Sequence, residues 1–159
     1  MFSGRASSSI VSPLAAFTLV ELLLVLAIVA VIATIAVPSY SSYIDRAKVT
    51  QAEGDIVQIE LATAQYLADN QVLPNALSDL SRVPVNDPWG NPYQYLNLGN
   101  VHGPGQARKD RSLVPINSDY DLYSMGHDGR SQPPLTASMS QDDVVRGRNG
   151  GFVGLASNF

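Results

Sequence analysis

The chain carries one long apolar stretch near its start, Phe17-Thr18-Leu19-Val20-Glu21-Leu22-Leu23-Leu24-Val25-Leu26-Ala27-Ile28-Val29-Ala30-Val31-Ile32-Ala33-Thr34-Ile35-Ala36-Val37. As an α-helix rising 1.5 Å per residue, this stretch would span roughly 31 Å, about the thickness of the hydrocarbon core of a bilayer. We therefore predict a membrane-spanning helix over residues 17–37. A short leader, residues 1–16, precedes it, and a soluble part, residues 38–159, follows it.

Glu21 is the only charged residue in this stretch. An ionised carboxylate in hydrocarbon costs about 2.5 kcal/mol or more, so acidic residues inside membranes usually have a partner or a function. No basic residue of the stretch can neutralise it. Either Glu21 lies near the headgroups and reaches water, or its partner comes from another chain or from a newly made N-terminus.

The sequence Ala16-Phe17-Thr18-Leu19-Val20-Glu21, followed by the apolar run, resembles the N-terminal signal of type IV pilins and type II secretion pseudopilins. This resemblance implies that a prepilin peptidase cuts between Ala16 and Phe17, and that the new N-terminus at Phe17 is methylated. It also implies that Glu21 meets the Phe17 amino group of a neighbouring subunit in a filament. Ala16 departs from the glycine that the family usually has there, but alanine is also small, so cleavage is still expected.

The leader supports retention of the apolar stretch. An ordinary secretory signal has its apolar core before the cleavage site, whereas here the core follows the expected cut. Arg5 is the only charged residue of the leader, and with the initiator amine it favours a cytoplasmic leader and a C-terminal part on the outer side. The alternative for this segment is an uncleaved single-pass anchor.

A stem helix is predicted to continue beyond the membrane. Pro38 is expected to kink the helix rather than end it, and Asn70, with Pro74 beyond it, is expected to end it. Between them, apolar residues recur mostly at spacings of three and four, which marks one face of an amphipathic helix. They are Tyr40, Tyr43, Ile44, Ala47, Ala52, Ile56, Ile59, Ala62, Tyr66 and Leu67. We expect the tyrosines among them to face the core of the soluble head.

The remainder predicts a small head with two strands. A short helix is expected at about Asn75–Leu80, and aromatic and alternating residues predict strands over Tyr93–Leu96 and Tyr120–Ser124. Gly99 to Asn117 reads as a loop, Ser124 to Gly129 as a turn, and the Gly-rich sequence from Asp142 onward as irregular. The predicted fold class is α+β, with a long N-terminal helix packed on a small antiparallel sheet and an irregular C-terminal loop region.

Three short sequences of the head narrow the resemblance. In order they are Asp87-Pro88-Trp89-Gly90-Asn91-Pro92-Tyr93-Gln94-Tyr95, Tyr123-Ser124-Met125-Gly126-His127-Asp128-Gly129, and Asp142-Asp143-Val144. Together with the N-terminal motif they are similar to the major pseudopilins of type II secretion. The departures are an insertion-like stretch at about 102–114 and a Gly-rich tail from Arg146 onward. The resemblance implies a helical homopolymer at the inner membrane with a periplasmic head, working with minor pseudopilins, an inner-membrane assembly platform and the prepilin peptidase.

The resemblance also implies a calcium ion, held by Asp128, by Asp143 and by the backbone carbonyl of Met125. Calcium takes six to eight oxygen ligands and tolerates irregular loops, and a loop-rich region without cysteine needs some staple to stay folded. From the residues alone, these aspartates are better interpreted as solvated turn formers, and it is the resemblance that favours calcium. We expect His127 to be exposed rather than a ligand, and Asp142 to point away if Asp143 points inward.

Composition excludes several functions. The net charge of −4 suggests no nucleic-acid partner, and with no cysteine and only two histidines the chain shows no catalytic or zinc-binding motif, so an enzyme is not expected. The function that the resemblance implies is a structural subunit of a type II secretion pseudopilus that drives protein export across the outer membrane. The alternatives are a type IV pilus subunit, disfavoured by the missing cysteine pair, and a non-polymerising, membrane-tethered, calcium-stabilised binding module.

Overall fold

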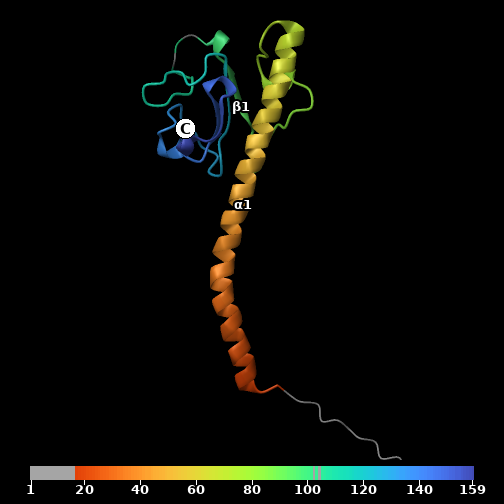
Figure 1. Cartoon of the computed structure of the whole chain (residues 1–159), viewed down its shortest axis with the longest axis vertical. Coiled ribbons are helices and arrows are strands. Elements are labelled where there is room, and N and C mark those ends of the chain that lie inside the picture. Colours follow the sequence, from red (N-terminus) through yellow and green to blue (C-terminus); the bar gives the residue numbers. More distant parts are fainter. Residues whose placement is uncertain (1–16, 102, 104) are drawn as a thin grey trace, which may run out of the picture. The chain divides into compact units, whose positions relative to one another are not determined.

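The structure is a computed structural model that describes residues 17–101, 103 and 105–159 (Figure 1). It divides into two compact units, residues 1–41 and residues 42–159. The predicted leader, including Ala16, lies outside the described residues. One helix, α1 (Leu19–Asn70, 52 residues), runs through both units.

Helix α1 ends where the sequence predicts. It continues through Pro38 and stops at Asn70, which is followed by Gln71 in the left-handed region at φ 61°. The Gln71 N–H still donates to the Leu67 carbonyl at 2.8 Å, and the Asn70 side chain donates to the Tyr66 carbonyl at 3.0 Å. These bonds satisfy carbonyls that the end of a helix leaves without partners.

The buried face of α1 is shorter than the predicted amphipathic face. Its fully buried positions are Ala52, Ile56, Ile59 and Thr63, at the three- and four-residue spacing of one helical face. The expectation that the stem tyrosines face the core is wrong for Tyr40 and Tyr43, whose exposed fractions are 69% and 70%. The periodicity is present there, but the packed positions of the helix begin further along the chain.

The head contains a four-stranded antiparallel sheet in the order β1-β2-β3-β4. The strands are β1 (Gln94–Asn97), β2 (Tyr120–Ser124), β3 (Val144–Gly147) and β4 (Phe152–Leu155). Single 3-10 turns lie at η1 (Leu77–Asp79), η2 (Leu98–Asn100), η3 (Ser138–Ser140), η4 (Arg148–Gly150) and η5 (Ala156–Asn158). Strand β2 has the predicted bounds, β1 begins one residue later than predicted, and the expected short helix at 75–80 is the turn η1.

The expectation of an irregular tail is wrong over residues 144–155, because β3 and β4 form a hairpin there. Arg148, Asn149 and Gly150 at its tip all have positive φ, a conformation that favours glycine and asparagine. A Cβ atom on Gly150 would collide with the Glu60 side chain of α1. The glycines therefore mark a tight turn that approaches the helix closely, and not a loss of regular structure.

Two apolar clusters lie on opposite faces of the sheet. On the α1 face, Ile56 and Ile59 pack with Leu122 and Val144. On the other face, Val145 packs with Ile116, Leu135 and Ala156. Because successive residues of a strand point to opposite faces, β2 and β3 each supply both clusters. The head is thus a helix, a sheet and a layer of ordered loops.

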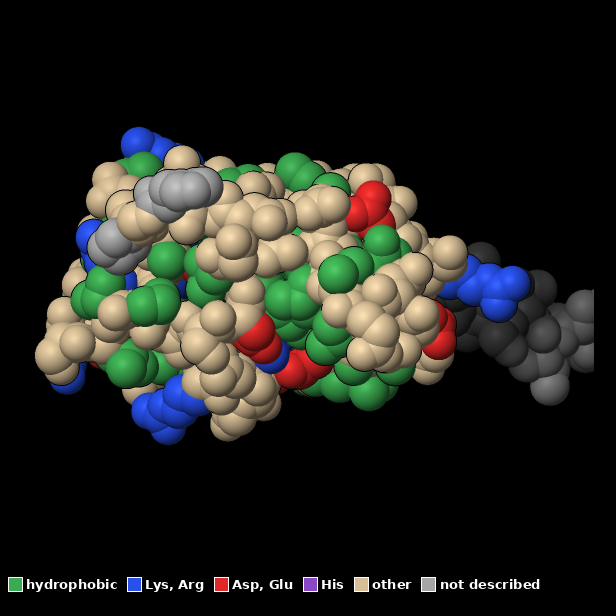
Figure 2. Space-filling view, turned by 90° about the horizontal axis from the view of Figure 1, so that it is seen from above, with side chains coloured by type: hydrophobic (Ala, Val, Ile, Leu, Met, Phe, Trp, Pro, Cys, Tyr) green, Lys and Arg blue, Asp and Glu red, His purple; other side chains and the backbone are tan. Residues whose placement is uncertain are grey.

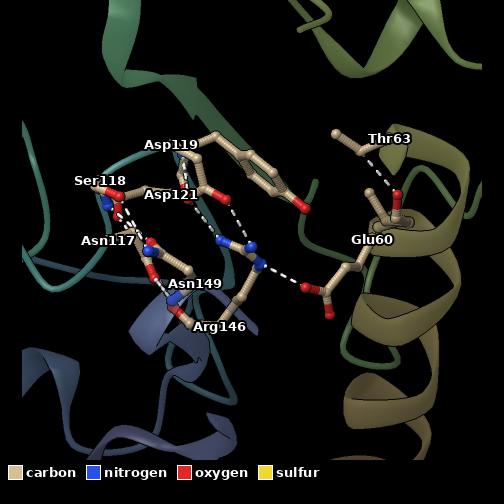
Figure 3. Close-up of polar contacts among 10 residues, drawn as sticks. Glu60, Thr63, Asn117, Ser118, Asp119, Asp121, Arg146 and Asn149 are labelled. Atoms are coloured by element: carbon tan, nitrogen blue, oxygen red, sulfur yellow. Dashed lines mark hydrogen bonds and ion pairs between the residues drawn. The ribbon is translucent and has the colours of Figure 1, made fainter. Parts of the chain in front are cut away.

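Arg146 of β3 joins the sheet to α1 (Figure 3). Its Nε donates to Glu60 Oε1 at 2.9 Å, and its two terminal nitrogens donate to the two carboxylate oxygens of Asp119 at 2.9 and 2.8 Å. The guanidinium also lies 4.0 Å from the centre of the Tyr120 ring. Such paired hydrogen bonds fix the orientation of the guanidinium in addition to neutralising its charge. The side chain of Arg146 therefore holds α1 and the sheet together as one polar clamp.

The face of the head in Figure 2 mixes hydrophobic, acidic and basic side chains in small, separate groups. On this face the described lysines and arginines lie apart from one another. No continuous basic patch is visible among the described residues of this view.

Candidate functional site

The first candidate site is the start of α1, which includes Glu21. Thr18 precedes the helix, and its Oγ1 accepts a hydrogen bond from the Glu21 N–H at 3.2 Å. Thr18 is therefore the N-cap and Glu21 the third helical residue, the threonine–glutamate spacing of a capping box. An anion in the first turn is favoured by the helix dipole, which partly offsets the cost of a charge in apolar surroundings.

The apolar side chains on both sides of Glu21 are exposed. From Leu19 to Val37 the large ones are half to three-quarters exposed, for example Leu19 at 73% and Val25 at 50%. Among the described residues, α1 is the one helix that is long and apolar enough to cross a membrane, judged by length and composition. Phe17 lies just before the helix and is 73% exposed. The expected cleavage at Ala16–Phe17 involves residues outside the described part.

The second candidate site is the turn after β2, where the calcium ligands are predicted. Asp128 is exposed, and its Oδ1 accepts the Arg130 N–H at 2.8 Å, as in an ordinary aspartate turn. His127 is exposed, as predicted. Gly126 has φ 64°, and a Cβ atom there would overlap the backbone carbonyl of Asp142, so this turn packs directly on the segment before β3.

Asp142 does not point away from the turn, contrary to expectation. Its Oδ2 accepts the Asp128 N–H at 3.1 Å, and its residue is partly buried. The structure thus joins Asp142 to Asp128, whereas the predicted ligands were Asp128 and Asp143. The Met125 residue is partly buried beside this turn.

Asp143 lies in a different environment. Its side chain is fully buried, and its Oδ2 lies 2.5 Å from an Arg108 terminal nitrogen and 2.5 Å from the Ser131 hydroxyl, which donates to it. Burial raises the pKa of Asp143 to about 6, although the Ser131 hydrogen bond and the Arg108 charge act to lower it. Its other oxygen, Oδ1, has no partner among the described residues.

Arg108 was not predicted as a functional residue. It belongs to the insertion-like stretch, and its side chain is 3% exposed. One terminal nitrogen donates to the Ser131 hydroxyl and, at 2.8 Å, to the Gln132 carbonyl, while the guanidinium lies 4.2 Å from the centre of the Tyr123 ring. The sequence signal for it is weak: a basic residue in an insertion, with its acidic partner 35 residues away.

These contacts test how well the predicted ligands fit calcium. A guanidinium already lies against the Asp143 carboxylate, and it would repel a divalent cation in a low-dielectric site. Among the described residues, no group of three or more histidine, cysteine, aspartate or glutamate side chains is placed to hold a metal. In this arrangement the residues around Asp143 do not fit a calcium ion, and calcium binding stays a prediction.

Comparison with known proteins identifies relatives along most of the chain. The chain is 35% identical over 138 residues to the type II secretion system core protein G of Pseudomonas aeruginosa, and the match covers 73% of this chain and 85% of that protein. The proteins of the same name from Aeromonas hydrophila and Vibrio cholerae are each 30% identical, over 139 and 134 residues, and the match covers 85% and 81% of their lengths. No family model and no solved structure matches the chain.

Proposed function

Because this chain belongs to the family of the type II secretion system core protein G, we propose that it is the repeating structural subunit of a periplasmic pseudopilus. In this proposal the subunits polymerise through α1, and the growing filament drives protein export across the outer membrane. The role is mechanical rather than catalytic. The chain works with a prepilin peptidase, an inner-membrane assembly platform and minor pseudopilins.

Glu21 is the observation that carries this proposal. It is the only acidic residue in an apolar segment whose large side chains are half to three-quarters exposed. A membrane tether gains nothing from such a charge, whereas a bundle of subunits can pair it. The partner we propose is the Phe17 amino group of a neighbouring subunit, exposed by cleavage after Ala16 and then methylated. Two opposite charges are each costly alone in an apolar bundle and tolerable together.

This proposal places the chain in the inner membrane with residues 38–159 in the periplasm. The alternatives predict different behaviour. A type IV pilus subunit would form filaments on the cell surface, and a tethered binding module would form none. Both the cleavage state and the polymer can be measured on the same preparation.

The test is intact-mass analysis of the protein from native membranes, combined with filament assays on two variants. We expect the mass of residues 17–159 plus one methyl group. Glu21→Ala should insert normally, because the helix becomes more apolar, but should lose filaments, since a neighbour's amine is left unpaired in the bundle. Asp45→Ala, at an exposed acidic position further along α1, is the matched control and should assemble normally. Residues 1–16 retained in the functional protein, or wild-type filament levels with Glu21→Ala, would reject the proposal.

A further inference from the structure

The insertion-like stretch meets the start of β3 on the sheet face that lies away from α1. Asp143 comes directly before Val144, and its position in the strand alternation places it on the same face as Val145. Arg108 reaches this face from the loop between β1 and β2. Its guanidinium lies over Tyr123 of β2, and one terminal nitrogen lies 2.5 Å from Asp143 Oδ2.

The backbone of Arg108 is fixed from both sides, which directs the guanidinium. Its N–H donates to Asp121 Oδ2 at 2.6 Å, and its carbonyl accepts the Ile116 N–H at 2.9 Å. The N–H of the next residue, Lys109, donates to the Pro133 carbonyl at 3.0 Å, and its carbonyl accepts the Leu135 N–H at 2.8 Å. Arg108 is therefore part of an ordered layer: its backbone is already fixed, and only the rotamer freedom of its side chain is lost when the guanidinium binds.

The charges of this pair are withdrawn from water. The side chains of Arg108 and Asp143 are 3% and 0% exposed. A buried carboxylate without a cation is strongly unfavourable, so the fold requires a positive charge at this place. The guanidinium supplies it, and its second terminal nitrogen donates to the Ser131 hydroxyl and to the Gln132 carbonyl, while its buried Nε has no partner among the described residues.

Arg108 thus gathers oxygen atoms from two separate segments, residues 131–132 and residue 143. A metal ion that is coordinated by loops has the same effect, because it neutralises a carboxylate and binds hydroxyl and carbonyl oxygens of neighbouring loops. We propose that the Arg108 guanidinium is the resident cation of Asp143, and that it fastens the insertion to the C-terminal hairpin without a metal ion. This inference is independent of whether the chain polymerises.

The first test is a melting experiment on the full-length protein in detergent. Wild type should melt at the same temperature in excess calcium and in excess chelator, because Arg108 occupies the Asp143 carboxylate. A higher melting temperature in calcium would overturn the proposal. This measurement uses the unaltered chain and therefore holds even if a variant fails to fold.

The second test removes the guanidinium. Arg108→Gln leaves Asp143 unpaired and should lower the melting temperature by roughly 10 °C or more. Arg108→Lys keeps a positive charge but loses the forked contacts, so it should melt between wild type and Arg108→Gln. Arg130→Gln, at an exposed arginine close in sequence to Ser131, is the matched control and should melt like wild type. Equal melting temperatures for Arg108→Gln and Arg130→Gln would also overturn the proposal.

Discussion

Arg146 and Arg108 are equally buried, but their acidic partners differ. Both arginine side chains are 3% exposed, and each lies over a tyrosine ring of β2, Arg146 on the α1 face and Arg108 on the other. The partners of Arg146, Glu60 and Asp119, keep 25% and 31% of their surface in water, whereas Asp143, the partner of Arg108, keeps none.

This difference decides what happens when a pair is broken. A partly exposed carboxylate can rotate towards solvent after its arginine is removed, so the loss of stability is limited to the contact itself. A carboxylate or guanidinium sealed inside the head cannot, and the charge left behind carries its full desolvation cost. Stability should therefore depend on the burial of the group that remains more than on the number of hydrogen bonds removed.

The largest expected effect is that of Asp143→Asn. This nearly isosteric change leaves the Arg108 guanidinium buried without its carboxylate, and the free energy of unfolding should fall by about 3–5 kcal/mol at neutral pH. Denaturant unfolding followed by the fluorescence of Trp89, the only tryptophan, measures it. The control is Asp142→Asn, which weakens one hydrogen bond at a partly exposed position and should cost about 1 kcal/mol or less. Equal losses for the two variants would contradict the comparison.

Arg146→Gln should have an intermediate effect, about 2 kcal/mol, because its charged hydrogen bonds are lost while Glu60 and Asp119 can still reach water. Glu60→Gln alone should cost less, since Asp119 continues to neutralise the arginine through two bonds. The double variant should lose less than the sum of the single losses, because both changes remove the same contact. A loss for Arg146→Gln as large as that for Asp143→Asn would show that partner burial is not what matters.

The sequence predicted the elements whose signals are local. The end of α1 follows from Asn70 and Pro74, and β2 follows from its own alternation, so neither needs information from elsewhere in the chain. The hairpin of β3 and β4 was missed because its glycines were interpreted as irregular structure, although Gly147, Gly150 and Gly154 are places of close approach to side chains. Glycine composition alone does not distinguish a loose tail from a tight turn.

The candidate site was predicted in part for the same reason. Glu21 is visible in sequence because a lone charge in an apolar run is a local anomaly. The pairing of Arg108 with Asp143 joins residues 35 positions apart, and that of Arg146 with Glu60 joins residues 86 positions apart. No periodicity connects such partners. A carboxylate that composition assigns to solvent, and that the resemblance assigns to calcium, can therefore be bound by an arginine from an insertion.

The smallest expected effect is the pH dependence contributed by Asp119. Partial burial acts to raise the pKa of Asp119, but hydrogen bonds from Arg146 and from the Tyr120 N–H outweigh it, and the pKa is lowered. A carboxyl group with a lowered pKa stabilises the fold fully above its unfolded pKa, about 3.9, and loses this contribution as the pH falls through the folded value. The gap in unfolding free energy between wild type and Asp119→Asn should thus be constant near neutral pH and shrink below about pH 4. Because the Asp119 carboxylate is partly exposed, this gap in unfolding free energy should be smaller than the loss of unfolding free energy caused by Arg146→Gln. Asp45→Asn, at an exposed position of α1, is the control, and at neutral pH it should cost less unfolding free energy than Asp119→Asn. A gap between wild type and Asp119→Asn that does not change with pH would mean that the contact between Arg146 and Asp119 stabilises the fold by packing rather than by charge. The partly exposed pair of Arg146 and Asp119 would then stabilise the fold by a different interaction from the buried pair of Arg108 and Asp143, and not only by a weaker one.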